Sequence, residues 1–296
     1  FNVTLKNIKF INGKVTGSAP LGGAIYCPQS NVNVINSTFI NTTAGDNGGA
    51  IFFGDSGTVI NSTFINTTAG NTGGAIHVSE GRVTVINSSF INTTAGDNGG
   101  AIYSFNANVT VVNSNFTNTK ASNNGGAIYG LNVTVSGSTF TNNTANDTGA
   151  IYSENGVNVT DSTFTNTTAY TYGGAITGNT VTVTNSNFTN TKASNNGGAI
   201  YSDNGVNVTD STFTNNTATN GGAIYSNNGN VTVTGSTFND TTATDGAYGG
   251  KGGAIYSVNN VTVSDSNFIK TTAGDDGGAI NGGNVTVKNS SFIDND

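Results

Sequence analysis

Three apolar positions recur along the chain at a nearly constant spacing. An isoleucine preceded by Gly-Gly-Ala, or once by Thr-Gly-Ala, occurs eleven times, and most successive isoleucines are 24–26 residues apart. These isoleucines are Ile25, Ile51, Ile76, Ile102, Ile128, Ile151, Ile176, Ile200, Ile224, Ile255 and Ile280. Between them lie Phe10, Phe39, Phe64, Phe90, Phe116, Phe140, Phe164, Phe188, Phe213, Phe238, Phe268 and Phe292. A fixed period of this length indicates a stacked-repeat architecture.

Each period contains three short segments with the composition of β-strands. In the repeat Gly125–Asn142 these are 127–129 (Ala-Ile-Tyr), 132–135 (Asn-Val-Thr-Val) and 139–141 (Thr-Phe-Thr). Gly, Asn, Asp and Ser separate the segments, and these residues favour bends because they tolerate positive φ or bond to their own backbone. We therefore expect three short strands per turn.

Alternation within the strands predicts which side chains face the interior. In the repeat above, Val133 and Val135 lie on one side of the strand and Thr134 on the other. We expect the Phe, Ile and paired Val side chains to stack inward. With them we expect a hydrogen-bonded ladder of the asparagines that follow Phe by two residues. The ladder residues are Asn41, Asn66, Asn92, Asn118 and Asn142.

These features predict a right-handed parallel β-helix of about eleven to twelve turns with ~25 residues per turn. No segment has a helical period, which excludes leucine-rich repeats, and propeller blades need ~40–50 residues. Two bends are longer than the others, at 14–21 and 244–251. We expect residues 1–296 to form one repeat domain, which is part of a larger chain or assembly.

The pairing of Gly-Gly-Ala-Ile with a Phe-Asn motif in every turn resembles the polymorphic outer-membrane-protein type of β-helix repeat. It also resembles the Asn/Thr-rich adhesin-like surface proteins of methanogenic archaea, which are the closer match. The outer-membrane repeat carries Phe-x-x-Asn, whereas most turns here carry Phe-x-Asn. The pairs that keep the longer spacing are Phe140/Asn143, Phe213/Asn216 and Phe292/Asn295. The resemblance implies an extracellular, cell-surface, adhesin-like role.

Composition and charge exclude several classes of function. The net charge is −7 and the chain has nine Lys and Arg, which argues against nucleic acid and against an anionic membrane surface. No apolar run approaches the ~18 residues that span a bilayer. Cys27 is the only cysteine, so an internal disulfide is impossible. We expect no cofactor.

Candidate catalytic and metal-binding residues are sparse. Asp161, Asp210 and Asp265 share one corner of their turns, and a polysaccharide lyase or hydrolase would need clustered carboxylates with a basic residue or a metal. No Arg or His accompanies them, so a structural role at the corner is the simpler interpretation. His77 has no second ligand nearby in the sequence. We therefore expect no catalytic site and no metal site, with adventitious calcium at the bends as the alternative to the latter; the acidic residues there are Asp46, Asp97, Asp275 and Asp276.

Aromatic residues follow the recurring isoleucine in most turns. If Ile points inward, this column points outward, and exposed rings can bind sugars or a partner protein. The alternative is a stack of rings that shields one sheet. The candidate outward aromatic stripe comprises Tyr26, Phe52, Tyr103, Tyr129, Tyr152, Tyr201, Tyr225 and Tyr256.

The residues that flank Phe should also face outward. Pairs such as Thr163 and Thr165 predict a flat threonine lattice, which suits ice binding. Toward the ends of the chain isoleucine replaces the second threonine. Those side chains would form apolar patches suited to lateral packing between copies. The isoleucines are Ile40, Ile65, Ile91, Ile269 and Ile293.

Sequons for N-glycosylation are abundant. The chain contains 22 Asn-x-Ser/Thr sequences, many of them in the repeated Asn-Val-Thr segment. An outward asparagine there could carry a glycan if the chain is secreted. The candidate sites are Asn108, Asn132, Asn158, Asn207, Asn230, Asn260 and Asn284.

The sequence thus favours a non-enzymatic, extracellular structural or adhesin-like protein, a building block of a cell-surface layer, sheath or fibre. Its expected partners are other copies of itself, end to end or side by side, and surface glycans or host proteins. An ice-binding or carbohydrate-binding β-helix is the alternative, and a polysaccharide lyase is the third hypothesis.

Overall fold

The computed structural model describes residues 2–17, 19–246 and 249–296. Phe1 and parts of the two longer bends, residues 18 and 247–248, lie outside the described residues. The described chain is an all-β, right-handed parallel β-solenoid of about twelve turns with about 25 residues per turn, which confirms the predicted fold class. No helix occurs in these ranges.

The chain divides into two compact units, and each unit is built from the same kind of coil. One unit comprises residues 1–146 and 150–154, and the other comprises 147–149 and 155–296. Each turn contributes to three parallel sheets, which we name by their residues: the Ile–Val sheet, the Phe sheet and the Thr–Ala sheet. The prediction of a single domain over 1–296 stays a prediction.

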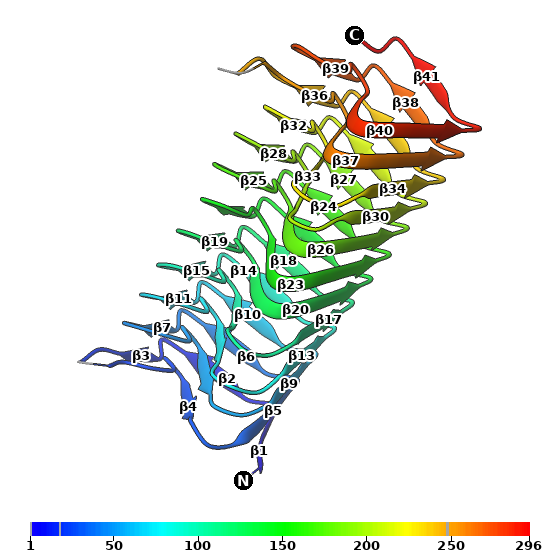
Figure 1. Ribbon diagram of the computed structural model, residues 1–296. Coiled ribbons are helices and arrows are strands. Elements are labelled where there is room, and N and C mark those ends of the chain that lie inside the picture. Colours follow the sequence, from blue (N-terminus) through cyan, green and yellow to red (C-terminus); the bar gives the residue numbers. More distant parts are fainter. Residues whose placement is uncertain (1, 18, 247–248) are drawn as a thin grey trace. The chain divides into compact units, whose positions relative to one another are not determined.

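In the first unit, equivalent strands of successive turns lie one above another (Figure 1). The Ile–Val sheet contains β1 (Asn2–Lys6), β4 (Ile25–Cys27), β5 (Asn31–Ile35), β8 (Ile51–Phe53), β9 (Gly57–Ile60), β12 (Ile76–Val78), β13 (Val83–Ile86), β16 (Ile102–Ser104), β17 (Val109–Val112) and β20 (Ile128–Ser136). The Phe sheet contains β2 (Lys9–Ile11), β6 (Thr38–Ile40), β10 (Thr63–Ile65), β14 (Ser89–Ile91), β18 (Asn115–Thr117) and β21 (Thr139–Thr141). The Thr–Ala sheet contains β3 (Lys14–Val15), β7 (Thr43–Ala44), β11 (Thr68–Ala69), β15 (Thr94–Ala95), β19 (Lys120–Ala121) and β22 (Thr144–Ala145).

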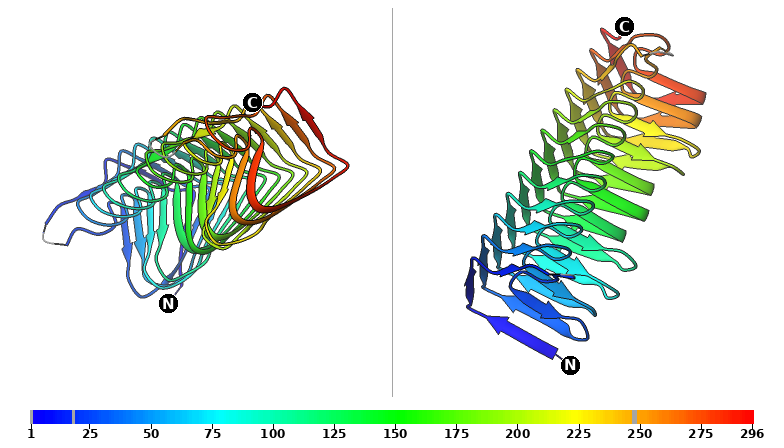
Figure 2. Two further views of the ribbon diagram at one scale, coloured as in Figure 1. Left: turned by 45° about the horizontal axis from the view of Figure 1, so that its top comes forward. Right: turned by 90° about the vertical axis from the view of Figure 1, so that its left-hand side faces the viewer.

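The second unit repeats this plan, and its successive turns follow one another in parallel (Figure 2). Strand β23 (Ile151–Thr160) contributes residues to both units. The Ile–Val sheet then contains β26 (Ile176–Thr184), β29 (Ile200–Ser202), β30 (Val206–Thr209), β33 (Ile224–Ser226), β34 (Val231–Thr234), β37 (Ile255–Ser264) and β40 (Ile280–Lys288). The Phe sheet contains β24 (Thr163–Thr165), β27 (Asn187–Thr189), β31 (Thr212–Thr214), β35 (Thr237–Asn239), β38 (Asn267–Ile269) and β41 (Ser291–Ile293). The Thr–Ala sheet contains β25 (Thr168–Ala169), β28 (Lys192–Ala193), β32 (Thr217–Ala218), β36 (Thr242–Ala243) and β39 (Thr272–Ala273).

The three sheets differ from the expected strands in two respects. The segments expected at 127–129 and 132–135 belong to one sheet, and in this turn they form the continuous strand β20. The third sheet is built instead from Thr-Ala pairs such as β7, which the sequence analysis did not predict. The Ala44 side chain is buried in the core at the end of that strand.

The predicted interior columns are confirmed. Phe64 is fully buried, and its ring stacks on Phe39 and Phe90 at centroid distances of 4.7 and 4.8 Å. The isoleucines of the Gly-Gly-Ala-Ile motif pair in register, as Ile76 does with Ile51 and Ile102. Repetition in register therefore converts single apolar residues into continuous buried columns, each of which contributes roughly 1.5–3 kcal/mol per side chain through burial.

The predicted asparagine ladder forms, but at the surface rather than in the core. Asn66 has a φ of 53°, and this left-handed conformation turns its side chain outward at a corner of the coil. Its amide nitrogen donates to Asn41 Oδ1 over 3.1 Å, and Asn92 donates to Asn66 in the same way. Asparagine suits this corner because its side chain tolerates the left-handed region.

Inside the coil, adjacent turns are connected by buried asparagines at another position of the repeat. Asn143 and Asn216 follow Phe by three residues, and both are fully buried. The Asn216 amide donates to the Phe188 carbonyl and to Thr191 Oγ1, over 3.2 and 2.8 Å. Most other turns have a buried threonine here. The Phe-x-x-Asn spacing therefore places a buried polar side chain that joins adjacent turns.

The Gly-Gly pairs are required by close packing between turns. Gly99 has a φ of 65°, which a residue with Cβ seldom adopts. A Cβ on the next residue, Gly100, would lie 2.0 Å from the Gly126 carbonyl oxygen of the following turn. The sequence therefore needs two glycines where the chain enters the Ile–Val sheet.

Candidate functional site

The aromatic column lies on the outer side of the Ile–Val sheet as a stack of rings. In the first unit the column runs through Tyr26, Phe52, His77, Tyr103, Tyr129 and Tyr152. Consecutive ring centroids in it are 4.8–5.4 Å apart. In the second unit Tyr201, Tyr225 and Tyr256 stack at 4.9–5.4 Å.

Stacking leaves little of these rings open to a ligand. Tyr26 is 53% exposed, but Phe52 and Tyr129 are only 8% exposed. Sugars stack on the faces of aromatic rings, and within the column one ring covers the face of the next. A ligand would thus meet mainly ring edges, and a binding role for the whole stripe stays a prediction.

Carboxylates at the edge of the stack fix two of the tyrosines. Tyr129 donates a hydrogen bond to Glu154 Oε1 over 2.5 Å, and Tyr201 donates to Asp203 Oδ1 over 3.1 Å. Burial, together with the neighbouring carboxylate, raises the pKa of both tyrosines. Each therefore stays a protonated donor at neutral pH, and its hydroxyl is already used within the protein.

One ring in the stack comes from a bend and was not predicted. The residue after Ile176 is Thr177, so this turn lacks the usual tyrosine. Tyr172, five residues earlier, supplies a ring that lies 4.9 Å from the Tyr201 ring between centroids, at an interplanar angle of 35°. The missing tyrosine and the nearby extra tyrosine were both visible in the sequence and could have identified this substitution.

His77 occupies the same column in the first unit. Its ring stacks between Phe52 and Tyr103, and Nδ1 lies 2.8 Å from Thr72 Oγ1. Burial lowers the pKa of His77 to about 4. These contacts describe a neutral packed ring, and the described residues contain no group of three or more His, Cys, Asp or Glu that could hold a metal ion.

The lowered pKa of His77 predicts a loss of stability in mild acid. Between pH 6.5 and about 4 the unfolded chain binds a proton that the folded chain does not, so acidification favours unfolding. We expect the free energy of unfolding to fall by about 2 kcal/mol from pH 7 to pH 5. Urea unfolding at both pH values measures this change. His77→Tyr, which restores the usual ring, should remove most of it; an equal loss in both proteins would contradict the assignment.

Acidic corner residues accept hydrogen bonds within the surface ladders. Asp161, Asp210 and Asp265 have φ values of 50°, 49° and 53° and are exposed at the corner that asparagine occupies in other turns. Asn185 donates to Asp161 Oδ1 over 2.5 Å, and Asn289 donates to Asp265 over 3.2 Å. Two of the three carboxylates thus accept bonds from asparagines of the next turn.

Two of the four bend acids considered for calcium have side-chain partners within the protein. Asp97 accepts a hydrogen bond from the Asn98 amide over 2.8 Å, and Asp276 pairs with Lys251 over 3.1 Å. Neither contact indicates a bound metal ion.

The candidate glycosylation sites fall into two groups. Asn158 and Asn207 lie between the two valines of their strands, and both are exposed. The others precede the first valine, and several join ladders: Asn132 donates to Asn108 over 3.0 Å, and Asn284 donates to Asn260 over 2.9 Å. The remaining candidate, Asn230, accepts a bond from the Asn260 backbone.

These differences predict unequal glycan occupancy in secreted, folded protein. Asn207 has threonines, Thr182 and Thr232, as its register partners, so no ladder occupies its amide nitrogen. Asn132 is half-buried and its amide nitrogen is already bonded. We expect Asn207 to be occupied and Asn132 to be largely unoccupied when the chain is secreted from a host that glycosylates asparagine. Glycopeptide mass spectrometry measures this, with Thr209→Ala as the control that removes the Asn207 sequon. Equal occupancy at both sites would contradict the prediction.

None of the described residues forms a helix long and apolar enough to cross a bilayer. In comparison with known protein families, residues 210–227 match the Chlamydia polymorphic membrane protein repeat. This segment contains Phe213, the buried Asn216 and the Gly-Gly-Ala-Ile motif that ends at Ile224. No curated protein and no solved structure matched the chain. The chain is thus similar, over these 18 residues, to a repeat of polymorphic membrane proteins.

Proposed function

We propose that this protein is a non-enzymatic, extracellular adhesin-like β-solenoid, a building block of a cell-surface layer, sheath or fibre. The observation that carries the proposal is the match of residues 210–227, most of one turn, to the polymorphic membrane protein repeat. Neighbouring turns share that turn's geometry, because Phe213 pairs in register with Phe188 and Phe238. The neighbouring turns therefore have the same repeat structure as the segment that matches the family.

The surface chemistry supports a scaffold rather than an enzyme. The outward positions are mostly Asn, Thr and Ser, repeated from turn to turn, and the acids considered as catalytic lie apart at exposed corners. Catalysis needs several groups held together around one reacting atom. A lyase remains the third hypothesis, and release of unsaturated sugars from pectin or alginate by the pure protein would refute our proposal.

Outward isoleucines provide a means of lateral association between copies. Ile65 pairs in register with Ile40 and Ile91, so the Phe sheet of the first unit carries a column of partly exposed aliphatic side chains. A second copy has the same spacing between turns, so two such columns can interdigitate along their length. We expect Ile65→Lys to weaken association of the protein with itself, while Thr84→Lys on the outer side of the Ile–Val sheet serves as a control for added charge.

The ice-binding alternative has less support from the side-chain contacts. Thr139 donates its hydroxyl to Asn115 Oδ1 over 2.5 Å, so this part of the lattice is bonded to itself. The alternation of Asn and Thr along the column also interrupts a uniform array. Measurable thermal hysteresis in the native protein would restore this alternative.

Immunogold electron microscopy of intact cells tests the proposal directly. We expect label on the outer surface and ordered arrays in thin sections of the native envelope. Lysed cells control for antibody access. Label confined to the cell interior, or protein found only as dispersed monomers, would overturn the proposal.

A further inference from the structure

The second unit contains a pocket of about 370 Å³ beside Tyr172, the ring that comes from a bend. Its lining comprises Tyr172, Asn195, Asn196, Thr219, Asn220, Gly246 and Gly249. Ligand pockets span roughly 300–1,000 Å³, so this volume lies at the lower end and suits a small molecule.

The aromatic side of the pocket is held in place. Tyr172 stacks against Tyr201, and its backbone nitrogen donates to the Asp147 carbonyl over 3.1 Å. The residue is nonetheless 36% exposed, because it lies at the end of the Tyr201–Tyr225–Tyr256 stack of this unit. It offers a ring surface that the other stacked tyrosines have buried against one another.

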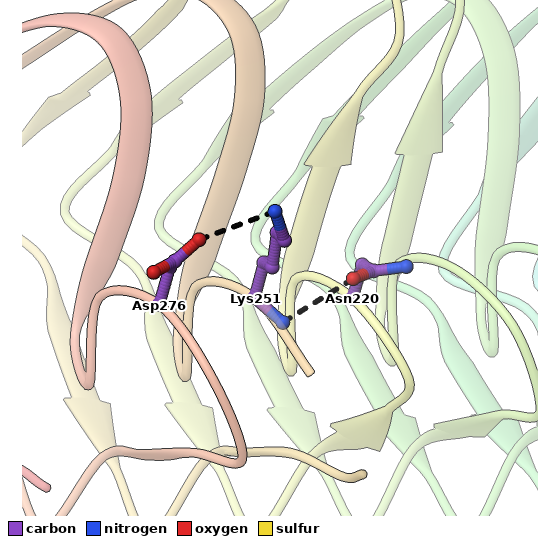
Figure 3. A network of polar contacts seen from close by, with 3 residues as sticks. All are labelled: Asn220, Lys251 and Asp276. Carbon is purple, nitrogen blue, oxygen red and sulfur yellow. Dashed lines mark hydrogen bonds and ion pairs between the residues drawn. The ribbon is translucent and has the colours of Figure 1, made fainter. Parts of the chain in front are cut away.

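The polar side consists of asparagine amides held by a ladder. Asn220 accepts from the Lys251 backbone nitrogen over 3.2 Å (Figure 3) and donates to Asn196 Oδ1 over 3.0 Å, so both of its amide atoms are used. This arrangement leaves the Asn196 amide nitrogen free to donate. Among the described residues the exposed Asn195 carboxamide has no hydrogen-bond partner, which leaves both a donor and an acceptor at the pocket.

The lining carries no charge. Lys251, whose backbone nitrogen bonds to the lining residue Asn220, extends its ammonium group to Asp276 Oδ2 at 3.1 Å, so its charge is paired (Figure 3). An anion would find no cation in the lining, and a metal ion would find no carboxylate. A ligand that fits combines an apolar face for the ring with adjacent hydroxyl groups for the amides.

We propose that this pocket binds a neutral saccharide of one or two residues, with a pyranose face on Tyr172 and its hydroxyls on Asn195 and Asn196. The Asn195 carboxamide can donate to one hydroxyl and accept from its neighbour, which is the pattern that a sugar ring presents, and the free Asn196 amide nitrogen can donate to a further hydroxyl. The inference gives the surface protein proposed above a ligand class, and it rests on that proposal for its biological setting.

Binding in solution tests the inference. The probes are the methyl glycosides of glucose, galactose, mannose and N-acetylglucosamine, with their β-linked disaccharides, screened by saturation-transfer NMR and titrated by calorimetry. We expect at least one probe to bind. Tyr172→Ala should weaken that binding about tenfold through loss of the ring. Asn195→Ala should weaken it about fivefold through loss of one hydrogen-bonding side chain.

The chain supplies a matched control for each variant. Tyr170 lies in the same bend and is 62% exposed, but it does not line the pocket. Asn123 lies in the same local sequence as Asn195, Lys-Ala-Ser-Asn-Asn-Gly-Gly-Ala-Ile-Tyr, in the other unit. Tyr170→Ala and Asn123→Ala should leave affinity unchanged. Because Asn195 is exposed, its variant should stay folded even if Tyr172→Ala does not.

Three outcomes would overturn the inference: no probe binds at millimolar concentration, affinity is unchanged in Asn195→Ala, or only charged compounds such as inorganic phosphate or glucuronate bind. These measurements use purified protein and do not depend on where it resides. Saccharide binding by a protein found inside the cell would uphold the inference while the surface role fails. An envelope protein that binds no saccharide would give the opposite result.

Discussion

Phe188→Ala is expected to lower the free energy of unfolding by about 3–5 kcal/mol, the usual cost of removing a buried phenylalanine ring. Phe188 is fully buried, and its ring stacks on Phe164 and Phe213, both at 4.8 Å between centroids. The neighbouring turns are held by their own backbone hydrogen bonds and cannot collapse into the space. The variant therefore leaves a cavity in the middle of a continuous column.

Chemical denaturation monitored by far-ultraviolet circular dichroism measures this loss. Phe292 provides the matched control, because it belongs to the same column and stacks on Phe268 at 4.8 Å but is 43% exposed. Phe292→Ala should cost less than half as much, since much of its surface already contacts solvent. Equal losses in the two variants, or a loss below about 1 kcal/mol for Phe188→Ala, would show that the column does not supply the stability assigned to it.

Deletion of a complete turn should leave the fold intact, whereas deletion of half a turn should not. Phe188 pairs in register with Phe213, and Thr189 pairs with Thr214. Removing residues 189–213 therefore joins Phe188 to Thr214 and restores the order of every column. In solenoids stability is approximately the sum of repeat and interface terms, so the loss of one repeat is a small change.

Removing residues 189–200 is the matched disruption. The shortened segment must then close one turn with about half of the usual residues, and its Phe, Val and Ile side chains lose their partners. We expect the complete-turn variant to keep the β-sheet signal per residue and to unfold cooperatively. The half-turn variant should lose much of that signal and much of its protection from hydrogen exchange. Similar behaviour of the two variants would contradict the stacking that the register pairs describe.

The fold was predictable because its main determinants are local and repeated. A buried column requires the same side chain in each turn, so the regular spacing of residues such as Phe64 and Ile76 predicted that they are buried. The Thr–Ala sheet was missed because a strand such as β7 has two residues, too few to show alternation. The sequence predicted two separate strands per turn where the Ile–Val sheet has one continuous strand in β20. The reason is that Gly or Asn lies between the two apolar segments and favours a bend, although the backbone of β20 continues through that region.

The candidate site was less predictable, because period does not determine which way a corner side chain points. Asn66 was expected in the core, but its left-handed backbone directs it to solvent, and the buried asparagine is one residue later, as at Asn216. Tyr172 interrupts the period, and a search for equivalent positions passes over it. Its contact with Tyr201 depends on how a bend folds back, which the sequence spacing alone does not specify.

The hydrogen bonds between turns also bear on how this asparagine-rich chain ages. Deamidation at Asn-Gly begins when the glycine nitrogen attacks the asparagine side chain to form a succinimide. At Asn98-Gly99 that nitrogen is bonded to the Asn124 carbonyl over 2.9 Å, and at Asn196-Gly197 it is bonded to the Asn220 carbonyl over 2.9 Å. In the folded coil these glycine nitrogens are therefore not available for attack. Deamidation at these Asn-Gly sequences should be slower than in a flexible peptide.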